Sequence, residues 1–268
     1  MVSSSKFQCV LADFESVNIN GKHSAIHTIC LIPATFTTGK LSQYILHYSQ
    51  GVVLKITDSL NDKILKAFLS TKRWYKDTTE NDWLNEKHAN DINTCVSNNI
   101  KIIRNMKFNP AIKFMNKFIM EHGGNLVMHN IMSDLEFLVS TQNLVKGPRI
   151  IKNKLSMYPD TGMYDPNWSK IVKHDSMSLF SIRCPNMARI YEEWAKNNNR
   201  TDKFNTLESL TQFVKNDRGY KESHSAVQDT IDLFHVLKYA SKCDGPIMDK
   251  YSFIVNAIKP TWINSKKG

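Results

Sequence analysis

The sequence lacks the features that place a protein in a membrane or outside the cell. No stretch approaches the roughly 18 consecutive apolar residues that a bilayer requires, and the start of the chain, from Met1 to Phe7, lacks the apolar core of a signal peptide. The 5 cysteines are odd in number, widely spread and without a CxxC pair, which argues against a disulfide framework and a structural zinc site. We therefore expect a soluble, intracellular protein of the cytoplasm or nucleus, with no membrane partner.

Glycine and proline are also scarce, at 10 and 8 of 268 residues. Because no repeat, low-complexity tract or long flexible linker divides the chain, one domain with insertions is the simplest organisation. Hydrophobic residues make up 41%, which is enough for a sizeable core. Lys and Arg number 35 against 25 Asp and Glu, and the resulting charge of +10 makes a polyanion such as nucleic acid the first partner to consider.

Five short segments have the composition and alternation of β-strands. They lie at residues 7–12, 25–36, 41–48, 126–128 and 171–175. Helical periodicity follows residues 57, 110, 130, 176, 205 and 224. A run of strands followed by alternating helices and strands is typical of a sheet covered by helices. We therefore expect an α/β fold with a mixed five-stranded sheet and helices on both faces.

The first expected strand leads into a D-x-E pair, Asp13 and Glu15. Two positions apart on an extended chain, these carboxylates project from the same face. Two acids on one face of a central strand are costly unless a cation neutralises them, so a divalent metal is the natural partner. The alternative is a strand that ends in solvent. A D-x-E match is also common by chance, since Asp134 and Glu136 form another.

A second motif, H-N-x-x-x-D, begins at His129 where an expected strand turns into a helix. Its structural alternative is a helix start, with Asn130 or Ser133 as the cap and Asp134 at the positive end of the helix dipole. That alternative is as plausible as a functional role.

The third motif is H-x-A-x-x-D, from His224 to Asp229, at the head of the last long expected helix. In order, the three motifs resemble those of the DEDDh, or DnaQ-like, 3′→5′ exonuclease family. The sequence between the second and third motifs is similar too. Residues 205–210 resemble the family's N-x-L-x-x-L helix, and Asp175-Ser176-Met177 resembles its D-T-L strand end. The resemblance therefore rests on several linked signals between Asp13 and Asp229.

The resemblance implies an RNase H-like fold and a metal-dependent exonuclease that hydrolyses the 3′ ends of single-stranded or frayed DNA or RNA. It assigns metal binding and catalysis to four acids, Asp13, Glu15, Asp134 and Asp229, with His224 as general base. Asp13 is expected to bridge two ions. Phosphodiester hydrolysis needs an attacking hydroxide and a stabilised leaving oxygen, which two ions roughly 4 Å apart provide, and oxygen ligands suit Mg²⁺ or Mn²⁺. Contacts to substrate are expected from Phe14, His129, Asn130 and Met132.

The motifs are spaced more widely than compact members of the family need. We expect a single domain over residues 1–268, with its core at about 7–241, insertions at about 72–100 and 146–168, and a C-terminal extension at 242–268. The second insertion mixes cations with aromatic residues, as single-strand binding does, or is a solvated loop with buried aromatics. A further stretch without acids has five cations that can face phosphate or solvent: Lys101, Arg104, Lys107, Lys113 and Lys117.

Two other classes of function compete with this hypothesis. The first is a nucleic-acid-binding module that kept the fold and lost catalysis, and the presence of all four acids and His224 argues against it. The second is a proofreading or RNA-processing subunit of a larger assembly, which requires a polymerase or other replication partner because the chain is too short for both activities. The Asn-, Lys- and Ile-rich composition is typical of AT-rich coding, which a virus or a parasite shares.

Overall fold

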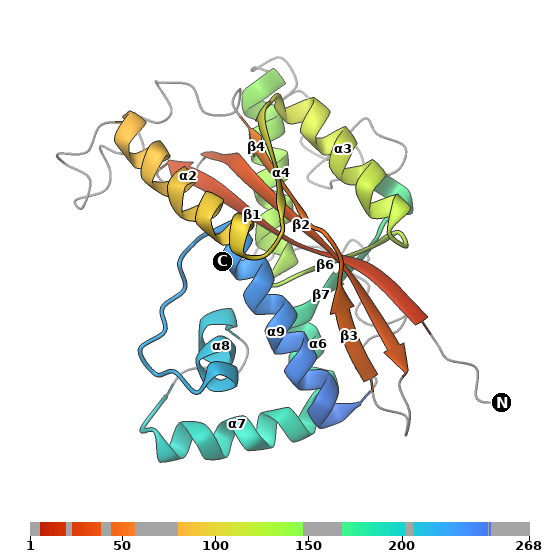
Figure 1. Ribbon diagram of the computed structural model, residues 1–268, viewed down its shortest axis with the longest axis vertical. Coiled ribbons are helices and arrows are strands. Elements are labelled where there is room, and N and C mark those ends of the chain that lie inside the picture. The colour runs from red at the N-terminus through yellow and green to blue at the C-terminus, as the bar shows by residue number, and fades with distance from the viewer. Residues whose placement is uncertain are drawn as a thin grey trace, which may run out of the picture.

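The computed structural model describes residues 6–19, 23–38, 44–56, 80–146, 168–201, 206–245 and 247. Within these ranges the protein is an α/β fold built on one mixed sheet of seven strands (Figure 1). The strands are β1 (Lys6–Ile19), β2 (His23–Thr38), β3 (Tyr44–Tyr48), β4 (Val52–Ile56), β5 (Lys101–Met106), β6 (Asn125–Met128) and β7 (Val172–Asp175). Six of them follow the order β5-β4-β2-β1-β6-β7, and β3 pairs with β2 off this path.

The strand directions bring the first two motifs next to each other on β1 and β6. Among the described strands, β2 alone runs opposite to the others, because it pairs antiparallel with β1, β3 and β4 whereas the remaining pairs are parallel. β6 and β7 therefore run parallel to β1, and β6 ends beside the middle of β1, where Val10 and Leu11 pair with Leu126 and Val127 just before Asp13. In open α/β sheets ligands bind outside the carboxyl ends of the strands, and the carboxyl ends of β6 and β7 lie next to this part of β1.

Helices cover both faces of the sheet, as expected. They are α2 (Glu80–Ser97), α3 (Phe108–Glu121), α4 (Ile131–Lys146), α6 (Ser176–Arg183), α7 (Pro185–Asn197), α8 (Leu207–Lys215) and α9 (Ala226–Asp244), with a 3₁₀ turn at Trp168–Lys170. None of these helices is both long and apolar enough to cross a membrane.

The alternation of β1 separates two hydrophobic clusters. Cys9 and Leu11 join the cluster formed with α2 and α6–α9, whereas Val10, Ala12 and Phe14 join the cluster formed with α3 and α4. Because successive side chains of a strand point to opposite faces, Asp13 and Glu15 lie on the α9 face. Figure 1 shows α9 lying across that face of the sheet.

The sheet has two strands more than the five expected. All five residues of β4 are buried. A strand buried on both faces does not alternate between apolar and polar residues, so the sequence VVLKI lacks the two-residue period by which a strand is predicted. β5 is an edge strand of largely exposed and half-buried residues, KIIRNM, within the basic stretch. Its sequence lacks the alternation of a half-buried strand, and pairing with β4 specifies it instead.

Several expected segments fall partly or wholly outside the described residues. The helix expected after residue 57, most of the segment at 146–168 and most of the extension after residue 242 lie there. The segment at 72–100 is described from residue 80 onward. It forms α2, whose Asp91 and Cys95 are buried against the α9 face. This segment therefore contributes to the core, and its status as an insertion stays a prediction.

Candidate metal centre

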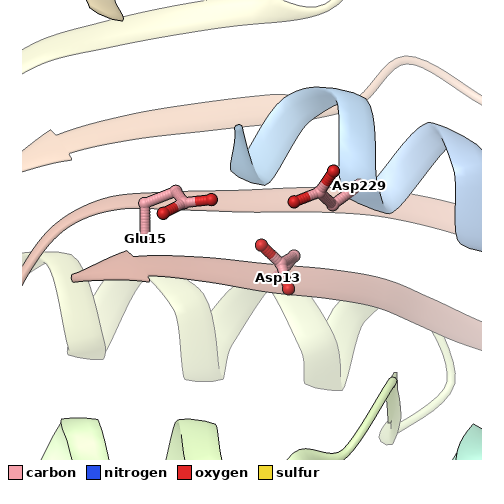
Figure 2. A group of neighbouring side chains, drawn as sticks. All are labelled: Asp13, Glu15 and Asp229. Atoms are coloured by element: carbon pink, nitrogen blue, oxygen red, sulfur yellow. The ribbon is translucent and has the colours of Figure 1, made fainter. Parts of the chain in front are cut away.

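Three carboxylates meet between the first strand and the last described helix. Asp13 and Glu15 come from β1 and Asp229 from α9, and one oxygen of each lies within 4.8 Å of the others. Figure 2 shows the three carboxylates turned toward one another. Asp229 is 4% exposed, and both β1 acids are half-buried. The pairing of the D-x-E acids on one face thus agrees with the expectation, and α9 adds a third acid from far along the chain.

Local structure explains why these side chains meet. The β1–β2 register shifts directly after Glu15, between Glu15 and Ser16, and such a bulge re-aims side chains near sites. Ser225 is the N-cap of α9 and its backbone carbonyl accepts a hydrogen bond from the Asp229 N–H at 2.8 Å. Asp229 therefore lies in the first turn of α9, where the positive end of the helix dipole favours a carboxylate.

Burial and the charges of neighbouring acids disfavour the ionised form of Asp13. Burial raises the pKa of Asp13 well above its ordinary value, and the charges of Asp134, Glu15, Asp229 and Glu222 add to that rise in this order. A divalent ion among these oxygens reverses the balance, because an opposite charge favours the ionised carboxylates. The centre thus has the electrostatics of a cation site.

Asp134 lies beside this centre but outside the group of three. It is 5% exposed in the first turn of α4, and its charge makes the largest charge contribution to the raised pKa of Asp13. Burial raises the pKa of Asp134 itself well above its ordinary value, followed by the charge of Asp175. The acid of the second motif is therefore near Asp13, on the side of the centre that faces β7.

Asp175 has a structural role at the end of β7. Its side chain accepts hydrogen bonds from the backbone N–H groups of Met177 at 3.3 Å and Ser178 at 3.1 Å. It also accepts one from the hydroxyl of Ser178 at 2.5 Å. Asp175 therefore caps α6, and the strand end that resembles the family's D-T-L sequence is held by this cap.

His224 lies in the segment between α8 and α9, together with an acid that sequence reasoning missed. His224 is exposed and has a left-handed backbone, with φ of 49°. Burial raises the pKa of Glu222, the nearby His224 opposes that rise, and Glu208 and Asp232 add to it. The charge of Glu222 also contributes to the raised pKa of Asp13, so Glu222 interacts electrostatically with both the histidine and the acids. No motif spacing pointed to it; its one signal was its place two residues before His224.

The segment with Glu222 and His224 is anchored by a buried carboxylate on α9. Asp232, which is 1% exposed, accepts hydrogen bonds from Lys215 and Gln228 at 2.9 Å each and one from the hydroxyl of Tyr220. The carbonyl of Tyr220 accepts a further bond from Gln212 at 2.7 Å. These bonds fix the segment to α8 and α9 just before the third motif.

The four expected substrate residues lie in different environments. Phe14 is 4% exposed in the cluster on the α3 and α4 face, because it alternates with Asp13 and Glu15, and its contact with a nucleotide stays a prediction. Met132 is half-buried and packs against the same cluster.

His129 and Asn130 both take part in the turn that joins β6 to α4. His129 Nδ1 is in hydrogen-bond contact with Ser176 Oγ at 3.0 Å. Asn130 has φ of 56°, is exposed, and donates from Nδ2 to Ser133 Oγ at 2.9 Å. The structural alternative for the second motif, a helix start shaped by Asn130 and Ser133, is therefore present beside the buried Asp134.

Comparison with known proteins gives no relative from which a function can be inferred, so a functional proposal depends on the geometry described above. No family model matches the chain, and no curated protein matches it significantly.

Proposed function

We propose that the protein is a metal-dependent 3′→5′ exonuclease of the DEDDh type, with an RNase H-like fold, acting on the ends of DNA or RNA. The observation that carries the proposal is the meeting of Asp13, Glu15 and Asp229, whose oxygens lie within 4.8 Å of one another. The strand pairing supports it, because β6 ends beside the middle of β1, so that the first two motifs begin on neighbouring strands.

The donor set fits Mg²⁺ or Mn²⁺. All three ligands are carboxylates, which are the oxygen donors these ions prefer, and neither a cysteine nor a histidine belongs to the group of three. Burial and then the neighbouring acids raise the pKa of Asp13, and a cation bound among these oxygens would favour the ionised carboxylate. When bound, such an ion supplies positive charge to a phosphodiester and its attacking water.

Each residue of the site has its own role in the proposed mechanism. Asp13, Glu15 and Asp229 hold the cation, and Asp134 adds negative charge on the β7 side. His224 takes a proton from the attacking water at its imidazole, for which an exposed side chain with an adjacent carboxylate, Glu222, is suited.

The charge distribution supports a nucleic-acid substrate. Buried and half-buried acids are gathered at the centre, so the remaining surface is more basic than the net charge of +10 indicates. Five exposed cations lie on β5, on α3 or between them: Lys101, Arg104, Lys107, Lys113 and Lys117. Phosphate backbones bind such surfaces with a strength that falls as salt is added.

The proposal is tested with end-labelled single- and double-stranded DNA and RNA, each with a 3′-blocked control. We expect release of nucleoside monophosphates from free 3′ ends in Mg²⁺ or Mn²⁺, abolished by EDTA and by Asp229→Asn. The matched control is Asp244→Asn, at the other end of α9, which retains activity. Wild-type protein that is inert with both ions on every 3′-ended substrate would overturn the proposal. Co-purification with a polymerase would place the activity in a proofreading assembly.

A further inference from the structure

A buried ion pair lies beside the candidate metal centre, outside all three motifs. Lys55 of β4 and Asp91 of α2 form the pair, and they are 5% and 4% exposed. Lys55 Nζ also donates to Thr28 Oγ1 on β2 at 3.1 Å. Removing two charges from water is expensive, and a buried pair contributes little to stability compared with an apolar pair of similar size. Its presence here therefore calls for an explanation other than stability.

The carboxylate of Asp91 reaches the helix that carries Asp229. Ser225 Oγ donates to Asp91 Oδ1 at 2.6 Å, and this contact joins α2 to the N-cap of α9. The same hydroxyl oxygen accepts from the N–H of Gln228 at 3.4 Å, and the Ser225 carbonyl accepts from the N–H of Asp229 at 2.8 Å. Asp91 thus holds the residue whose backbone bonds directly to a candidate metal ligand.

The other end of this network lies beside the β1 acids. Glu15 pairs with Thr28 across β1 and β2, and Thr28 pairs with Lys55 across β2 and β4. Residues paired in this way lie in one row with their side chains on the same face of the sheet. One continuous set of bonds therefore runs from the row of Glu15, through Lys55 and Asp91, to the first turn of α9.

We propose that Lys55, Asp91 and Ser225 are positioning residues that fix the distance between Asp229 and the acids of β1. This inference rests on the proposed metal centre. Apolar contacts are non-directional, whereas a hydrogen bond from the N-cap of α9 to a charged carboxylate is directional and defines one position. Metal affinity depends on such positions, because ligands must meet at a fixed distance.

The other buried carboxylate on α9 does not share this task. Asp232 bonds to Lys215, Gln228 and Tyr220, and so it anchors the segment before the helix. Asp91 is, within the described part of the chain, the acid that contacts the α9 N-cap side chain from another element.

Mn²⁺ affinity of the metal-free protein, measured by titration calorimetry and by electron paramagnetic resonance of free Mn²⁺, tests the inference without a nuclease assay. We expect Ser225→Ala to weaken Mn²⁺ binding about 10- to 100-fold, the range for residues that orient metal ligands. Ser225→Thr keeps the hydroxyl and restores affinity. The matched control is Thr206→Ala, which removes the N-cap of α8, where Thr206 accepts from Ser209 N–H at 3.2 Å, and leaves Mn²⁺ affinity unchanged.

A second pair of variants separates positioning from stability. The double variant Lys55→Met, Asp91→Leu removes both charges and keeps the apolar volume, so we expect it to stay folded and to bind Mn²⁺ about 10- to 100-fold more weakly. Its control is Asp244→Asn, because Asp244 also accepts from a helix start, the N–H groups of Asn186 at 2.7 Å and Met187 at 2.9 Å.

The outcomes distinguish the two proposals. Mn²⁺ binding by wild-type protein with unchanged affinity in Ser225→Ala and in the double variant overturns the positioning role and leaves the metal centre standing. Equal losses in Thr206→Ala and Asp244→Asn also overturn it, because the effect is then general destabilisation. Wild-type protein that binds no Mn²⁺ overturns the metal centre, and the positioning role with it.

Discussion

The hydroxyl of Tyr220 donates a hydrogen bond to Asp232, a carboxylate of α9 that is 1% exposed. Lys215 Nζ lies over the ring of the same tyrosine, 4.1 Å from its centre. This one side chain therefore joins α8, α9 and the segment that carries Glu222 and His224. The general base that we propose thus depends on a contact made four residues before it.

Replacing Tyr220 by Phe keeps the ring over Lys215 and removes the hydroxyl. We expect the free energy of unfolding to fall by about 1.5–3 kcal/mol, as for a hydrogen bond to a charged group. We also expect kcat to fall roughly 10-fold, because a looser segment misplaces His224. Denaturant unfolding and steady-state kinetics measure the two effects. Tyr239→Phe, at a half-buried tyrosine of α9 that packs against Phe213, is the control, and equal kinetic losses in both variants would refute the link to His224.

The pKa of Asp13 gives a pH-dependent prediction for stability. Burial and then the neighbouring acids raise this pKa on folding, so the contribution of Asp13 to stability is full below the pKa of an unfolded aspartate, roughly 3.9. It is lost as the pH rises through the folded value. Asp13→Asn cannot ionise. In EDTA at pH 8 we expect this variant to be more stable than the wild type by roughly 0.5–2 kcal/mol.

The advantage of Asp13→Asn is expected to shrink as the pH falls from 8 to 5, because the raised pKa of Asp13 favours protonation of the wild-type carboxyl at lower pH. Denaturant unfolding at both pH values measures it. Saturating Mn²⁺ at pH 8 is expected to reverse the order of the two proteins, since binding stabilises the wild type. An advantage that stays the same at pH 5 and pH 8 would show that Asp13 is not under the electrostatic strain described.

His224 is expected to act in the chemical step and not in metal binding, because it is outside the group of three oxygens. We expect His224→Ala to lower kcat by about 10²- to 10⁴-fold, the usual contribution of a general base. Mn²⁺ affinity should stay within the error of the titration. The control is His235→Ala, an exposed histidine further along α9. Loss of Mn²⁺ binding in the His224 variant would instead make this residue a ligand.

Phe14 is expected to matter for stability and not for substrate. Because it is 4% exposed in the core on the α3 and α4 face, Phe14→Leu should cost roughly 1–2 kcal/mol. Below the unfolding transition, KM for a 3′-ended oligonucleotide should be unchanged. Thermal unfolding and kinetics at low temperature measure these values. A raised KM with unchanged stability would contradict this prediction and show that Phe14 contributes to substrate binding.

The sequence was most informative where one residue spacing determines which face a side chain occupies. Two residues apart on a strand, Asp13 and Glu15 had to share a face, and the structure has them so. The same alternation places Phe14 on the opposite face, in the cluster formed with α3 and α4. The α/β class, the mixed sheet and the helices on both faces were also predictable, because periodicity changes clearly along the chain.

What sequence reasoning missed depends on contacts between distant elements. The fully buried β4 has no alternation to read, and β5 is specified by its pairing with β4. Lys55, Asp91 and Ser225 come from three elements, and nothing in their spacing relates them. Glu222 likewise matters through proximity to Asp13 and His224. Such residues are found only after the fold has brought them together.

The division of the metal centre between β1 and α9 has a consequence for biosynthesis. A chain leaving the ribosome pairs β1 with β2 early, because the two strands are neighbours in the sequence. Asp229 arrives only after α9 has been made and has docked on the sheet. Until that moment two acids lie together without their third partner. A nascent chain therefore cannot bring the three acids together before α9 has docked, and the proposed metal binding and hydrolysis would begin only after that step.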